Sequence, residues 1–218
     1  GPWKDLITKR YPQAPVYLVR RGSKEVKNLG SLAAVGAGKV AAAKLVANMA
    51  ANASRKAAAK IPYLGTLLVA NDILANPWIL AKTRAGMTGA ILADIITRTQ
   101  TESFILIGHS LGARVMLTAA QLLGTRHSEP KLEAVHLLGA AVSAKGDWRT
   151  LDAAVRDRVW NYHSTKDPVL HWLYRYAQLG SRAIGSVGIR SKFPKITDRD
   201  VSRTVPTHSA YFTGLTLQ

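Results

Sequence analysis

Ser110 is the residue best placed for nucleophilic chemistry, because it stands in the segment GHSLG at residues 108–112. A serine at a sharp turn between a strand and a helix needs small neighbours, since the turn strains its backbone and crowds the flanking residues. Gly108 and Gly112 supply that space, and a helix that starts after Ser110 favours negative charge at its hydroxyl. We therefore predict that Ser110 is a nucleophile and that the N–H of Leu111 is an oxyanion donor.

A serine hydroxyl is a weak nucleophile without a base, so this chemistry requires a histidine and a carboxylate elsewhere in the chain. In proteins with this type of serine turn, the acid follows the serine and the histidine comes last. Asp167 follows an apolar run at residues 159–163, and His208 lies near the C-terminus. We therefore predict Asp167 as the acid and His208 as the base, with Asp147 as the alternative acid. Taken alone, Asp167 before Pro168 is more typical of a helix N-cap.

No cofactor or metal is predicted. The sequence has no cysteine, which removes zinc–thiolate and iron–sulfur sites, and no two histidines flank a glutamate at the metalloprotease spacing. The segment GAGKV at residues 36–40 lacks the first glycine and the final serine or threonine of a phosphate-binding loop. Among the remaining histidines, we expect His109 to point away from the site and His136 to lie in the core.

The elements that must position these residues alternate between strands and helices. Sequence patterns predict strands at residues 15–19, 103–107, 134–142 and 159–163, and helices at residues 76–98, 113–123, 151–156 and 168–178. This alternation is typical of an α/β fold, a mainly parallel sheet flanked by helices. We expect the alanine-rich residues 31–75 to form a helical insertion or cap within one domain of residues 1–218.

The charge of the chain is strongly positive, with 30 Lys and Arg against 13 Asp and Glu and a formal net charge of +17. Such a surface attracts anions, whether nucleic acid, anionic lipid headgroups or an acidic protein. Lysines interrupt every apolar window in the alanine-rich stretch, so no membrane span is expected there. No signal-peptide pattern follows Gly1.

The sequence resembles the α/β-hydrolase-like family of transmembrane and coiled-coil domain proteins, once classed as a domain of unknown function. The resemblance covers residues 76–212 most clearly and is carried by NPW, RAG, LADII, LIGHSLGARV, VHLLGAAVS, VWNYHSTKDPVL and HSAYF. It implies a lipase-like serine hydrolase that acts at or near membranes, with Ser110 as nucleophile, Asp167 as acid and His208 as base.

The resemblance has two further implications. Related domains occur in bacterial toxins and secretion effectors, which suggests a secreted toxin with an acidic immunity or chaperone protein as partner. Folds of this kind take a second oxyanion donor from a loop after an earlier strand. We expect that strand to lie before Gly1, or the loop to be present in altered form at residues 21–23.

Two functions follow from these features. The first is a serine hydrolase that cleaves carboxylic esters of lipids, as a lipase or phospholipase peripheral to anionic membranes. The alternative is a catalytically inactive basic module that binds an acidic protein or nucleic acid. Nucleic acid is the less expected partner, because only 7% of the residues are aromatic and they do not alternate with basic ones.

Overall fold

A computed structural model describes residues 1–20, 63–126, 128–175, 178 and 180–218. The chain divides into two compact units, one of Gly1–Arg21 with Lys82–Gln218 and the other of Gly22–Ala81. The long helix α4 (Tyr63–Arg98) has residues in both units, whereas the candidate site residues all belong to the first. The cap predicted at residues 31–75 lies mostly outside the described residues.

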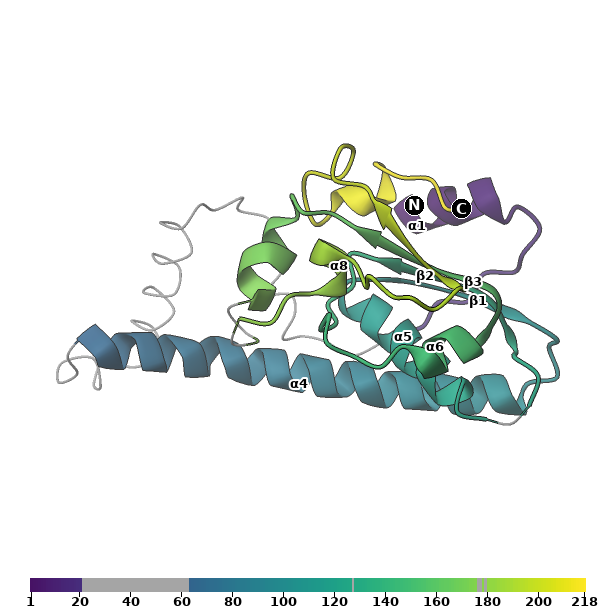
Figure 1. Cartoon of the computed structure of the whole chain (residues 1–218), viewed down its shortest axis with the longest axis horizontal. Helices are drawn as coiled ribbons and strands as arrows, with labels where there is room; N and C mark the ends of the chain where they lie inside the picture. The colour runs from purple at the N-terminus through teal and green to yellow at the C-terminus, as the bar shows by residue number, and fades with distance from the viewer. Residues whose placement is uncertain (21–62, 127, 176–177, 179) are drawn as a thin grey trace. The chain divides into compact units, whose positions relative to one another are not determined.

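The first unit is built on four parallel strands in the order β1-β2-β3-β4 (Figure 1). The strands are β1 (Phe104–His109), β2 (Leu132–Leu138), β3 (Val155–His163) and β4 (Ile196–Asp200). The helices around them are α1 (Pro2–Arg10), α5 (Leu111–Leu123), α6 (Arg149–Ala153), the π-helix η2 (Val169–Tyr174), α8 (Ile184–Val187) and the 3-10 helix η3 (Ala210–Phe212). The predicted α/β class with a parallel sheet flanked by helices is confirmed.

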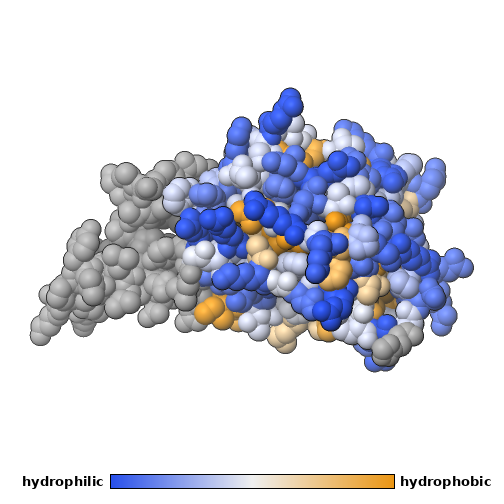
Figure 2. All heavy atoms as spheres, in the orientation of Figure 1, coloured by the Kyte–Doolittle hydropathy of each residue, from blue (hydrophilic) through white to orange (hydrophobic). Residues whose placement is uncertain are grey.

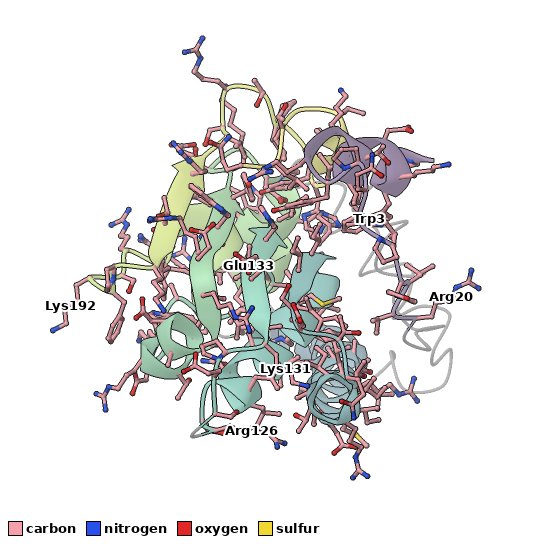
Figure 3. All side chains as sticks on the ribbon, turned by 90° about the vertical axis from the view of Figure 1, so that its right-hand side faces the viewer. Trp3, Arg20, Arg126, Lys131, Glu133 and Lys192 are labelled. Atoms are coloured by element: carbon pink, nitrogen blue, oxygen red, sulfur yellow. The ribbon has the colours of Figure 1, made fainter. Side chains whose placement is uncertain are left out.

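Helical layers cover both faces of the sheet. On one face, α5 and the C-terminal part of α4 bury a mainly aliphatic core that includes Ile96 and Leu137. On the other face, α1 and the C-terminal segment bury a more aromatic core that includes Leu6 and Tyr211. Figure 3 shows the sheet between these layers, with α1 and its Trp3 on one side and α5 and α6 on the other.

Strand β1 lies at one edge of the sheet, although its sequence FILIGH is highly apolar. The N–H groups of Phe104 and Ser110 both donate toward β2, at 2.8 and 3.0 Å. Because alternate residues of a strand point their N–H groups to opposite sides, those of Ile105 and Ile107 point outward from the sheet. Within the described ranges no strand pairs with that side of β1.

Several predicted elements are confirmed with shifted ends, namely the strands at residues 103–107, 134–142 and 159–163 and the helices at residues 113–123 and 151–156. The third strand begins four residues earlier than predicted, at Val155. The second ends at Leu138, because Gly139 follows with φ 49° and breaks the extended chain. Within the helix predicted at residues 168–178, the structure describes the π-helix η2 over Val169–Tyr174.

One predicted strand and one predicted helix start are wrong. Residues 15–19 form no strand and their apolar side chains are exposed, by 80% at Tyr17, because strand propensity needs a partner strand to be realised. The pair Asn76-Pro77 does not begin a helix, since α4 already starts at Tyr63. A proline inside a helix removes one hydrogen bond, and a long helix can continue past it. Neither α1 nor β4 was predicted.

Candidate active site

Ser110 occupies the turn between β1 and α5, with backbone dihedrals φ 57° and ψ −121°. A non-glycine residue in such a conformation costs about 1–3 kcal/mol and is held there by its surroundings. The N–H of Ser110 donates to the carbonyl of Leu138, and its own carbonyl accepts the N–H of Ala141 at 3.2 Å. The chain at the end of β2 therefore fixes the turn on both sides of the serine.

The two glycines that flank Ser110 are not equivalent. A Cβ atom on Gly108 would lie 2.5 Å from the carbonyl oxygen of Gly112 and 2.7 Å from the backbone of Ala113. A Cβ atom on Gly112 would meet nothing within 4 Å. The close approach of β1 to the first turn of α5 thus requires Gly108, whereas Gly112 borders open space at the start of the helix.

Asp167 and His208 are in direct contact. Nδ1 of His208 lies 2.6 Å from Oδ2 of Asp167, and because a carboxylate accepts, Nδ1 carries the proton of this hydrogen bond. The Asp167 side chain is fully buried and that of His208 is 17% exposed. The other oxygen, Oδ1, accepts the N–H groups of Val169 and Leu170 at 3.0 and 3.2 Å. Asp167 therefore caps η2 with one oxygen and orients the imidazole of His208 with the other.

A buried serine joins the loops that carry Asp167 and His208. The Ser164 hydroxyl donates to the carbonyl of Val205 at 2.6 Å and accepts the N–H of Lys166 at 3.2 Å. Ser164 itself is inaccessible to solvent. This link holds the two loops in register beyond the ends of β3 and β4.

His109 connects the serine turn to the residue His208. Nε2 of His109 lies 2.8 Å from the carbonyl oxygen of His208, so Nε2–H donates, and the two ring centroids are 4.5 Å apart. Among the residues that the structure describes, the Ser110 hydroxyl makes no hydrogen bond of its own. The expectation that His109 points away is wrong, because strand alternation puts its side chain on the face where the C-terminal segment packs.

The alternative acid, Asp147, lies apart from His208. Its carboxylate accepts the N–H of Arg149 at 3.0 Å and stands 3.9 Å from the guanidinium of the same residue, with 68% of its side chain exposed. The contact that could orient an imidazole is therefore made by Asp167.

The backbone at the start of α5 supplies hydrogen-bond donors next to Ser110. The first N–H groups of a helix have no partner within the helix, and Leu111 is the first residue of α5. The loop at residues 21–23, expected as the altered source of a second donor, lies outside the described residues. In the described part of the chain, no group of three His, Asp or Glu residues could hold a metal ion.

Two of the side chains near His208 have shifted pKa values. Burial, and secondly the neighbouring His208, lower the pKa of His109 to about 3, so its imidazole is uncharged. Burial, with a contribution from Asp167, raises the pKa of Tyr211 well above its usual value. Arg114, one helical turn after Ser110, donates through Nε and Nη2 to the carbonyl of Ala141 at 3.1 and 2.9 Å.

Sequence reasoning missed two of these residues. Arg114 stands four positions after Ser110, a spacing that places it one turn along the same helix side and could have drawn attention to it. His109 is part of the GHSLG segment, but its role depends on which chain packs on that face of β1, and no local pattern reports this.

The chain belongs to the family described as "Protein of unknown function (DUF726)", which matches residues 1–216. It is 34% identical to the rice protein named "Transmembrane and coiled-coil domain-containing protein STS1" over 161 residues, which are 72% of this chain and 24% of that protein. It is 34% identical over 155 residues to an uncharacterized membrane protein of Caenorhabditis elegans, covering 69% of this chain and 25% of the relative.

A further relative, from Saccharomyces cerevisiae, is named "Probable lipase MIL1" and is 31% identical over 142 residues, 64% of this chain and 13% of the yeast protein. The chain thus spans about a quarter or less of the length of these relatives, and none of the three names refers to a toxin. No solved structure matches the chain. Among the helical residues that the structure describes, no helix is both long and apolar enough to cross a membrane.

Proposed function

We propose that this chain is a serine ester hydrolase that acts on lipids, with Ser110 as nucleophile, His208 as base and Asp167 as the acid that orients it. The observation that carries the proposal is the 2.6 Å hydrogen bond between His208 and the fully buried Asp167. Ser110, in the turn after β1, is held at positive φ. Neither feature is needed for a sheet to fold, and together they provide the groups that acyl transfer requires.

The proposed reaction has two steps. The Ser110 Oγ attacks the carbonyl carbon of the ester, and His208 Nε2 takes the hydroxyl proton and gives it to the departing alcohol. An acyl-serine remains, which water attacks while His208 again accepts a proton. The acid is then released, and the proton returns to Ser110. The N–H of Leu111 stabilises the oxyanion in both steps.

The unbonded Ser110 hydroxyl is compatible with this reaction. Catalytic hydrogen bonds are often absent or long without substrate and form in the Michaelis complex. Rotation of one serine side chain moves the hydroxyl without disturbing the backbone of the turn, which two hydrogen bonds to the β2 end hold in place.

Three observations support lipids as the substrates. One relative is named a probable lipase, and two others are named as membrane or transmembrane proteins. The net charge of +17 favours anionic headgroups, each well-placed Lys or Arg contributing about 1 kcal/mol near such a surface. Figure 2 shows one face on which hydrophilic residues predominate and hydrophobic ones form small separate groups.

The direct test combines active-site labelling with turnover. We expect a fluorophosphonate probe to label the wild-type chain at Ser110 and the protein to release fatty acid from phosphatidylglycerol vesicles and from a soluble butyrate ester. Ser110→Ala should lose labelling and about 1,000-fold or more of turnover, because the nucleophile is gone.

The matched control is Ser128→Ala, which removes an exposed serine from the loop after α5 and should change neither readout. Equal turnover by wild type and Ser110→Ala would remove Ser110 from the mechanism. A wild-type chain that neither labels nor hydrolyses, yet binds acidic protein or duplex nucleic acid in a salt-dependent way, would favour the inactive binding module instead.

A further inference from the structure

We propose that His109 is a positioning residue that sets the distance between the serine turn and the loop that carries His208. The inference rests on the proposed function and extends it. His109 precedes Ser110 directly, and it binds the backbone carbonyl of His208 itself. Between the described residues 108–112 and 205–212, this is the one hydrogen bond. A single side chain thus connects the neighbour of the nucleophile to the backbone of the base.

The chemical state of His109 suits this role. A carbonyl oxygen only accepts hydrogen bonds, so the tautomer must carry its proton on Nε2. Burial keeps the imidazole neutral down to about pH 3, where the pKa of His109 lies. The ring therefore stays uncharged over the pH range in which esterases work, and its tautomer alone decides whether Nε2 donates. A cationic ring 4.5 Å from the ring of His208 would oppose proton uptake by the base, and neutrality avoids that repulsion.

Aromatic packing fixes the orientation of the His109 ring. Its centroid lies 5.4 Å from that of Tyr211 and 5.0 Å from that of Phe212, both in η3, which begins two residues after His208. The Tyr211 hydroxyl in turn donates to the carbonyl of Gly185 at 3.3 Å. His109 therefore holds the His208 loop at two places, the carbonyl of the base and the helix that follows it.

The other contacts of the His208 loop do not fix its distance from Ser110. Ser164 ties the loop to the region after β3, which sets His208 relative to Asp167 but not relative to Ser110. A displacement of about 1 Å between nucleophile and base can cost about 100-fold in rate. The His109 hydrogen bond supplies the missing constraint from the side of β1.

The test compares two variants of similar size. His109→Gln can place an amide N–H near the position of Nε2, whereas His109→Met fills the same space without a donor. We expect His109→Met to lower kcat for the butyrate ester about 10- to 100-fold with KM within about twofold, because binding is intact and alignment is lost. The rate of fluorophosphonate labelling should fall in parallel. His109→Gln should recover most of both rates.

The outcomes separate this inference from the proposed function. A wild-type chain without hydrolysis contradicts the proposed function. If the wild type is active, the role of His109 is overturned when kcat falls equally in His109→Gln and His109→Met, or falls in neither. If His109→Met does not fold, nitrogen-15 NMR of the histidine rings in the wild-type protein decides. A neutral ring protonated at Nε2 at pH 5 supports the inference, and a ring protonated at Nδ1 or charged at that pH overturns it.

Discussion

Ser110 holds a backbone conformation that glycine adopts more readily than serine. Its φ of 57° and ψ of −121° are imposed by hydrogen bonds to Leu138 and Ala141. This conformation places Ser110 at the end of β1, beside the first N–H groups of α5. The placement of this side chain therefore costs the folded protein stability at Ser110.

We predict that Ser110→Gly raises the free energy of unfolding by about 1 kcal/mol, because glycine relieves most of the strain at positive φ. Ser110→Ala keeps a Cβ atom and should leave stability near that of wild type, so it serves as the control. Urea unfolding followed by circular dichroism measures both. Equal stability of the glycine and alanine variants would mean that the turn is not strained.

Residue types and their order in the chain were enough to select Asp167 and His208, and the structure brings these two side chains together. The order of these two residues after Ser110 was informative. The carboxyl ends of parallel strands lie at the same end of the sheet, so the loops that follow them lie there too. The orientation of His109 was not predictable in this way. It depends on long-range packing against Tyr211 and Phe212, which lie about 100 positions away in the sequence.

At the scale of elements, the junction of β1 and α5 depends on one glycine more than on the other. We predict that Gly108→Ala lowers the free energy of unfolding by about 2 kcal/mol or more, because its Cβ would overlap backbone atoms of Gly112 and Ala113 that cannot rotate away. Gly112→Ala should be neutral or slightly stabilising, since its Cβ meets open space in the first turn of a helix.

Thermal unfolding of the two variants measures this difference, and each is the control for the other. Because Gly112 borders open space, Gly112→Ala should keep the fold intact. Its turnover can therefore be measured as well as its stability. Similar losses of stability in both variants would contradict the asymmetry.

The inner strands and α5 were predictable because their apolar patterns reflect burial on one or both faces. Strand β4, with the sequence ITDRD, lies at the other edge of the sheet and needs few apolar residues, so no such pattern marks it. Helix α1 is polar and short, and one buried residue, Leu6, anchors it. At residues 15–19 an apolar pattern predicted a strand that is absent, since the pattern alone does not tell whether a neighbouring strand is available.

At the scale of the whole molecule, His136 joins the two ends of the chain. This fully buried histidine lies 2.7 Å through Nε2 from the Tyr11 hydroxyl and 3.1 Å through Nδ1 from the Tyr162 hydroxyl. Tyr162 in turn accepts the N–H of the last residue, Gln218, at 2.9 Å. Residues after α1, two inner strands and the C-terminus thus meet in one polar cluster.

This cluster makes stability depend on pH. Burial lowers the pKa of His136 to about 3, whereas an unfolded histidine has a pKa of about 6.5. Between these values the unfolded chain binds a proton that the folded chain does not, so stability falls as the pH falls. We predict that wild type loses about 2 kcal/mol more between pH 7 and pH 5 than His136→Gln, which cannot titrate.

Urea midpoints of both proteins at the two pH values measure this difference. Only the change with pH is compared, because the glutamine also alters the hydrogen bonds at every pH. Identical slopes for wild type and variant would show that His136 is accessible to protons in the folded state.

One side of β1, which no described strand pairs with, lies next to the backbone that leads into Ser110. An extended peptide that joins this side gains main-chain hydrogen bonds from Ile105 and Ile107 without having to displace a described strand. It would then run beside the backbone that turns at Ser110, with His109 as the next outward N–H. A peptide added at this margin would therefore lie against the backbone that leads into the turn, and it would contact that turn through main-chain groups alone.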